Sequence, residues 1–97
     1  MPPPDLAVRC QPVADGWLCD VTIGPDDGAT HHQVTVPDAI LARLSPGETQ
    51  PHELVRASFA FLLQREPRES ILRSFDLPVI GRYFPDWEAA IRRGGGG

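Results

Sequence analysis

The chain has 97 residues, a hydrophobic fraction of 41% and a charged fraction of 23%, which limits it to one domain and excludes a disordered chain. Its formal net charge of −4 argues against the concentrated positive surface that broad binding to nucleic acid or to an anionic membrane requires. No apolar run approaches the ~20 residues that a membrane-spanning helix needs.

The two ends of the chain differ in composition from the rest. Residues 1–5 form a proline-rich lead without the basic and apolar regions of a signal peptide, so we expect a cytoplasmic protein. Residues 94–97 are a glycine tail. We therefore expect two disordered ends around a single α+β domain over residues 6–93. All nine basic residues are arginine, which favours a GC-rich bacterial genome.

The first part of the chain alternates apolar and polar residues with the period of a β-strand. Residues 17–23 show this alternation most clearly. Asp15-Gly16 predicts a hairpin between this strand and the one before it, and residues 25–28 predict a second turn. The sequence therefore predicts a three-stranded antiparallel meander over about residues 6–36.

Prolines divide the remainder of the chain into short helices, because proline suits a first helical turn and breaks a helix interior. The predicted helices span about residues 37–44, 51–65, 67–74, 76–83 and 86–92. The expected fold class is α+β, with an N-terminal three-stranded antiparallel β-meander packed against a C-terminal layer of three to five short helices.

The helix predicted at residues 51–65 is apolar on more than one side. Its large apolar side chains spread over an arc of roughly 200°, about twice the width that one supporting face needs. The sheet can cover one side. The other side is covered either by the C-terminal helices of the same chain or by the same helix of a second chain, and the sequence leaves both arrangements open.

Aromatic side chains concentrate in the second half of the chain, where six of the seven lie. Such a concentration predicts either the centre of the core or a surface for a partner, because aromatic residues bury large areas and are enriched at interface hot spots. The candidate partner-binding residues are Phe59, Phe61, Tyr83, Phe84 and Trp87. We expect a non-enzymatic protein–protein interaction or assembly module that binds another protein or a second copy of itself, and no membrane.

Residues with catalytic or metal-binding chemistry do not form a defensible set. Cys10, Cys19, His31 and His32 have suitable atoms for zinc, but their spacing matches no zinc motif, and adjacent histidines face opposite sides of a strand. The serines lie in no nucleophile-elbow motif, and the glycine run at residues 94–97 leads into no helix. We therefore predict no catalytic residue, no metal and no cofactor.

The state of the two cysteines depends on the register of the first hairpin. If Asp15 and Gly16 are the two turn residues, Cys10 and Cys19 are diagonal neighbours, an unfavourable geometry for a bridge. If the loop is Val13–Gly16, the cysteines face each other and a bridge becomes feasible. A cytoplasmic setting disfavours a disulfide, so we expect reduced thiols.

The stretch that begins at residue 31 resembles the ribbon–helix–helix family. His-His-Gln-Val-Thr-Val-Pro is followed by a short helix, a turn with Pro46-Gly47, and a second helix that begins near Glu53. In that family two chains pair one strand each and place alternate polar side chains in the DNA major groove. The resemblance implies an alternative function as a dimeric DNA-binding regulator. The implied DNA contacts are His31, Gln33, Thr35 and Arg56.

The span from Trp17 to Trp87 also resembles a group of small, functionally uncharacterised proteins of GC-rich bacteria. The residues that carry this resemblance are His32–Val36, Ser58–Pro67, Ile71-Leu72 and Arg82–Pro85. The resemblance implies no activity. It implies that the span is a unit.

Overall fold

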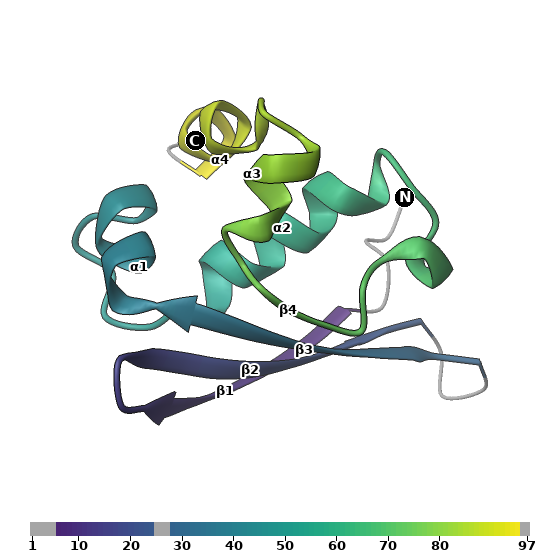
Figure 1. The fold of residues 1–97 in the computed structure, drawn as a ribbon, viewed down its shortest axis with the longest axis horizontal. Helices are drawn as coiled ribbons and strands as arrows, with labels where there is room; N and C mark the ends of the chain where they lie inside the picture. The colour runs from purple at the N-terminus through teal and green to yellow at the C-terminus, as the bar shows by residue number, and fades with distance from the viewer. Residues whose placement is uncertain (1–5, 25–27, 96–97) are drawn as a thin grey trace.

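The computed structural model describes residues 6–24 and 28–95, and within them every helix lies on one face of a four-stranded sheet (Figure 1). The strands are β1 (Leu6–Val13), β2 (Gly16–Ile23), β3 (Thr30–Pro37) and β4 (Ser74–Asp76), in the spatial order β1-β2-β3-β4. The first three pair antiparallel, which confirms the predicted meander, and β4 pairs parallel to β3. The lead at residues 1–5 and most of the predicted second turn lie outside the described residues.

In the described part of the chain, four α-helices follow the meander. They are α1 (Asp38–Leu44), α2 (His52–Leu63), α3 (Val79–Tyr83) and α4 (Trp87–Gly95). Prolines occupy the N-cap positions of the first three, where no intrahelical hydrogen bond needs the missing N–H group. The α+β class is therefore confirmed, and α4 continues past its predicted end at residue 92 into the glycine run.

The segment at residues 67–74, predicted as a helix, contains only a 3₁₀ turn at Arg68–Ser70 and then extends into β4. Its backbone finds hydrogen-bond partners on β3 rather than within a helix. The carbonyl of Arg73 accepts the N–H of Gln33 at 2.7 Å, and the N–H of Leu77 donates to the carbonyl of Thr35 at 2.9 Å. The helix prediction is wrong here because pairing with a strand distant in sequence outweighs the local pattern.

The hairpin between β1 and β2 decides the state of the cysteines. Val13 pairs with Gly16 and Cys10 pairs with Cys19. This is the register expected for the longer predicted loop, Val13–Gly16. The two cysteine Cα atoms are 4.0 Å apart and the side chains form a disulfide. The expectation of reduced thiols is therefore wrong, because this register brings the two side chains directly opposite each other.

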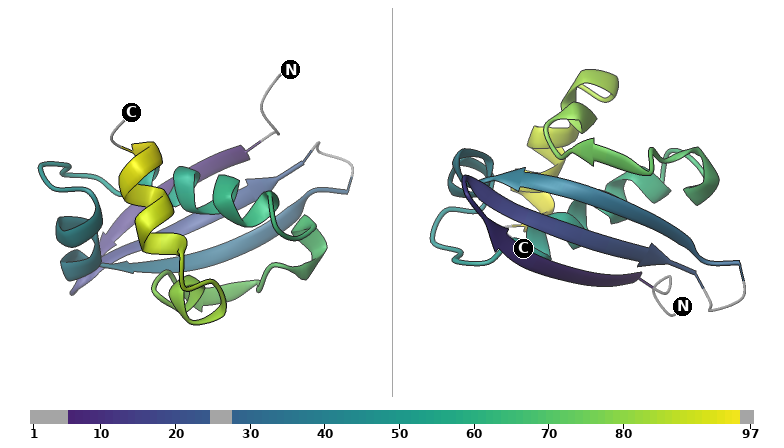
Figure 2. Two further views of the ribbon diagram at one scale, coloured as in Figure 1. Left: turned by 90° about the horizontal axis from the view of Figure 1, so that it is seen from above. Right: turned by 60° about the horizontal axis from the view of Figure 1, so that its bottom comes forward.

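Helix α2 is covered on two sides by its own chain, as Figure 2 shows from two directions. One side packs on the sheet near β1 and the other packs on α4. Trp87 of α4 is fully buried against α2, and its indole N–H donates to Ser58 Oγ at 3.1 Å. Because α4 supplies the second cover, α2 needs no second copy of the chain to bury its apolar side chains.

The core is one apolar layer between the inner face of the sheet and the helices. Its most buried large members are Val21, Ile23, Val34, Val36, Val55, Phe59, Leu77 and Trp87. The other face of the sheet carries exposed polar side chains such as Asp20, His31 and Gln33. Among the helices of the described residues, none combines the length and the apolar character that crossing a membrane requires.

Candidate partner-binding pocket

The five aromatic residues predicted to bind a partner fall into two groups. Phe59 and Trp87 are 0% exposed and Phe61 is 6% exposed, so these three side chains belong to the core and are not available to a partner. Tyr83 is 66% exposed, and Phe84 is half-buried. Of the predicted set, only Tyr83 and Phe84 reach the surface.

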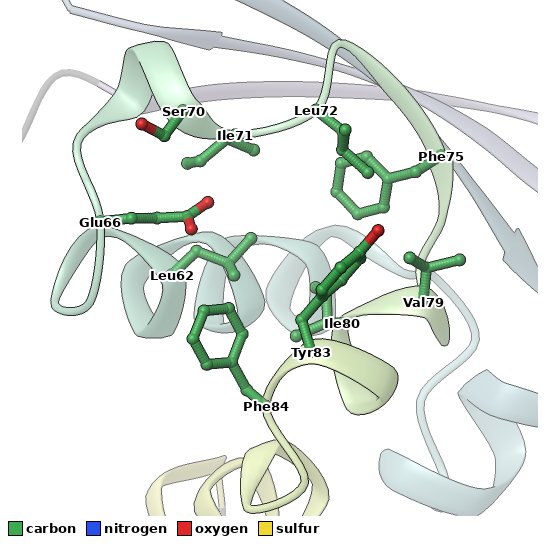
Figure 3. Close-up of a pocket in the computed structure, with 10 residues that line it drawn as sticks. All are labelled: Leu62, Glu66, Ser70, Ile71, Leu72, Phe75, Val79, Ile80, Tyr83 and Phe84. Carbon is green, nitrogen blue, oxygen red and sulfur yellow. The ribbon is translucent and has the colours of Figure 1, made fainter.

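Tyr83 and Phe84 line an apolar pocket of about 330 Å³ (Figure 3). This volume lies near the lower end of the roughly 300–1,000 Å³ that is common for binding pockets. The walls come from the end of α2, the segment after the 3₁₀ turn, β4 and α3. The lining residues are Leu62, Glu66, Ser70, Ile71, Leu72, Phe75, Val79, Ile80, Tyr83 and Phe84. All of these residues lie within residues 62–84, and β4 contributes one wall of the pocket.

The wall at Phe84 is fixed by contacts with α2. The rings of Phe61 and Phe84 meet edge to face with their centroids 5.9 Å apart. The guanidinium of Arg65 lies 3.7 Å from the centroid of the Phe61 ring and also pairs with the carboxylate of Asp86 at 2.6 Å. These contacts tie the connection between α3 and α4 to α2. The Phe84 side of the pocket is therefore preformed.

The opposite wall, at Leu72, is held by a buried histidine that sequence reasoning did not assign to a site. His32 is 4% exposed, its Nδ1 donates to the carbonyl of Leu72 at 2.8 Å, and its Nε2 is hydrogen-bonded to the hydroxyl of Thr30 at 3.0 Å. Its ring also packs on Phe59, 5.6 Å between centroids. The sequence did contain one sign of this role, because His32 stands at an inward position of a strand that is otherwise apolar on that face.

Three polar groups stand among the apolar pocket walls: the Glu66 carboxylate and the hydroxyls of Ser70 and Tyr83. Figure 3 shows the Glu66 side chain directed into the pocket from the wall opposite β4. Within the described residues no hydrogen bond or ion pair involves the Glu66 carboxylate. The pocket can therefore receive an apolar group and, at one end, pair with a positive charge.

The residues implied by the ribbon–helix–helix resemblance are not brought together. His31, Gln33 and Thr35 lie on the outer face of β3, whereas Arg56 lies on α2 and donates to the carbonyl of Leu6 at 3.0 Å. β3 is an inner strand, paired with β2 on one side and with β4 on the other. A ribbon made of β3 from two chains would require β3 to leave one of these neighbours, so the sheet does not favour this hypothesis.

The four side chains considered for zinc are also separated. Cys10 and Cys19 are joined to each other, and His31 and His32 point to opposite faces of β3. Over residues 6–24 and 28–95, no three side chains of His, Cys, Asp or Glu gather as a metal site would require.

Comparison of the chain with protein-family models, with curated proteins and with solved structures finds no match. Function is therefore inferred from the residues and contacts of this chain alone. The pocket described above is the feature of the described residues that most resembles a binding site, because it is concave, largely apolar and carries few polar groups.

Proposed function

We propose that this protein is a non-enzymatic protein–protein interaction module that binds the apolar part of a partner side chain in the pocket between α2, β4 and α3. The observation that carries the proposal is where the exposed apolar side chains lie. Among the described residues three large hydrophobic side chains are exposed, and two of them, Leu72 and Tyr83, line this pocket. Scattered single exposures need no explanation, but two beside one apolar cavity point to a docking surface.

The chemistry of the rim favours a protein partner. Tyrosine is enriched at interface hot spots, because its ring supplies a large apolar area and its hydroxyl can hydrogen-bond. The tyrosine ring is presented beside a pocket whose Phe84 wall is already fixed, so little ordering is needed on binding. A different protein is the favoured partner, because α4 already covers the helix that a second copy would otherwise have covered.

A photo-crosslinking amino acid at position 83, expressed in the native host cell, tests the proposal. The matched control carries it at position 13, where Val13 is the third exposed hydrophobic residue, at the far end of the β1–β2 hairpin. The proposal expects a specific protein adduct from position 83 and not from position 13. An adduct of twice the chain mass would identify the partner as a second copy. Absence of an adduct at position 83, or equal adducts at both positions, would refute the proposal.

A further inference from the structure

The outer edge of β4 carries backbone groups that the sheet leaves unpaired. In a parallel ladder, alternate residues of a strand bond to the neighbouring strand. The carbonyl of Arg73 and the N–H of Leu77 bond to β3. Phe75 lies midway between them, so its backbone groups also point towards β3. The N–H and C=O groups of Ser74 and Asp76 therefore point away from β3, and no described residue is hydrogen-bonded to them.

The opposite edge of the sheet, on β1, is partly protected against the addition of another strand. In an antiparallel pair, the residues whose Cα atoms are closest do not hydrogen-bond to each other, and Cys10 and Cys19 form such a close pair. The backbone N–H and C=O groups of Cys10, and of every second residue from it along β1, therefore point away from β2. Pro12, in this outward set, has no N–H group, and the outward carbonyl of Leu6 accepts the guanidinium of Arg56. Prolines and covering side chains are common protection against strand addition. Among the described residues, the outward set of β4, Ser74 and Asp76, contains no proline, and no side chain is hydrogen-bonded to its backbone.

The pocket lies beside this free edge, on the helical side of the sheet. Phe75 of β4 and Leu72 just before it form one wall, and Glu66 projects from the opposite wall (Figure 3). A strand added beside β4 would direct every second side chain to the helical side, and one of them would stand over the pocket. The same bound segment can therefore use the free backbone groups and the pocket together.

The pocket chemistry specifies a long side chain with a cationic tip. The methylene stem of lysine or arginine packs well on apolar surface while its charged end reaches a polar partner. Here the apolar stretch leads from Leu72 and Tyr83 towards the Glu66 carboxylate, which has no cation of its own among the described residues. Charge complementarity at the far wall thus favours a basic residue over a purely apolar one.

We infer that the partner supplies an extended peptide segment that pairs with β4 as a fifth strand and inserts a lysine or arginine side chain into the pocket towards Glu66. The inference rests on the proposed function and names the class of partner that the same pocket binds. Main-chain hydrogen bonds to Ser74 or Asp76 supply affinity, and the pocket supplies specificity, as in other cases of strand addition.

The first stage of the test selects probes. Peptides from a displayed library of random 12-residue sequences are selected on the full chain. Pocket binders should lose at least ~10-fold in affinity with Leu72→Asp and with Tyr83→Ser, as expected on removing a hot-spot contact, and should keep their affinity with Val13→Ser. If no selected peptide meets this criterion, both the proposed function and this inference are overturned.

The second stage tests strand pairing. Each pocket-binding peptide is made in two versions, N-methylated at one or the other alternate set of amides. One version should bind at least ~10-fold more weakly, because methylation removes the donors that face β4, whereas the other set faces away. The variant Ser74→Pro removes a main-chain donor from the protein in the same way, because it deletes the outward N–H of Ser74 and no bond to β3. If both methylated versions bind as the parent does, strand pairing is refuted while pocket binding stands.

The third stage tests the cation. Replacing the pocket lysine or arginine of the peptide by norleucine should weaken binding to the unchanged protein about 2- to 5-fold, as expected for the loss of a partly exposed ion pair. The same replacement should have no such effect on binding to the Glu66→Gln variant. This coupling would support the assignment of Glu66. Selected peptides without a basic residue, or equal losses with both forms of the protein, would refute it.

Discussion

The two edges of the sheet are secured in different ways. β1 pairs with β2 along all eight of its residues, and a disulfide between Cys10 and Cys19 ties the two strands together. β4 pairs with β3 over three residues only, and its position depends on contacts from distant parts of the chain. The chief of these are the hydrogen bond from His32 to Leu72 and the packing of Phe75 on Phe59.

This difference links stability to the candidate site. The long, covalently tied edge borders no part of the pocket, whereas the short edge forms one of its walls. An edge strand left open is a liability, and a short one limits that liability. We propose from this contrast that β1 serves the stability of the domain and β4 serves binding, and the variants below test each half of that proposal.

The largest effect is expected from His32→Ala. The change leaves the Leu72 carbonyl and the Thr30 hydroxyl without their partner and opens a cavity beside Phe59, so we expect a loss of about 2–4 kcal/mol in the free energy of unfolding. Chemical denaturation measures this loss. Hydrogen exchange should accelerate most at the amide of Leu77, which bonds to β3 behind β4.

The control for this change is the neighbouring histidine on the outer face of the same strand. His31→Ala removes an exposed side chain and should alter the free energy of unfolding by less than about 0.5 kcal/mol. Equal losses in the two variants would show that His32 does not hold β4.

Reduction of the disulfide is the next largest change, and it acts on the other edge. The two cysteines are separated by 9 positions in sequence, and chain-entropy arguments give about 2–3 kcal/mol for a loop of that length. Denaturation with and without a thiol reductant measures the loss. Affinity for a pocket-binding peptide should stay unchanged below the unfolding transition. A large fall in affinity on reduction would contradict the separation of the two edges.

Ser58→Ala tests the contact between α2 and α4, which lies in the helical layer above both edges of the sheet. The change leaves the buried indole N–H of Trp87 without an acceptor, so the free energy of unfolding should fall by about 1–2 kcal/mol. Because the contact joins α2 to α4 and touches neither edge, hydrogen exchange should accelerate alike in β1 and β4. Ser70→Ala, at an exposed serine, is the matched control and should have little effect.

The smallest change in stability is expected from the exposed hydrophobic residues. Tyr83→Ser and Val13→Ser should each shift the free energy of unfolding by less than about 0.5 kcal/mol, since both side chains are exposed at the surface. Only Tyr83→Ser should reduce crosslinking or peptide binding. If the two variants reduce binding equally, the pocket is not the docking surface.

Sequence patterns located the parts of the fold that local chemistry determines. Period-two alternation gave the three antiparallel strands, and prolines marked the starts of α1, α2 and α3. The register of the first hairpin stayed open, because Asp15-Gly16 fits either loop, and the structure selects the one that bridges the cysteines. β4 could not be predicted, because three residues carry no period and its partners lie on a distant strand.

The candidate site was predictable only in part, for the same reason. The concentration of aromatic residues pointed to Tyr83 and Phe84, but composition cannot separate these from Phe59 and Trp87, which the fold buries completely. Leu72 and Glu66 were not predicted as binding residues, because nothing in the sequence places them beside Tyr83 and Phe84. They become part of a site only when β4 joins the sheet and closes the wall between them and α3.

Binding at the β4 edge is tested most directly by residue-resolved hydrogen exchange of the full chain, measured by NMR with and without a pocket-binding peptide. The outward amides of Ser74 and Asp76 on β4 should exchange at least ~10-fold more slowly in the complex, because new main-chain hydrogen bonds protect them. The amides of Val8 and Cys10 on β1 should be unaffected. Protection at β1, or unchanged exchange at Ser74 and Asp76, would contradict the claim that the β4 edge is the binding edge.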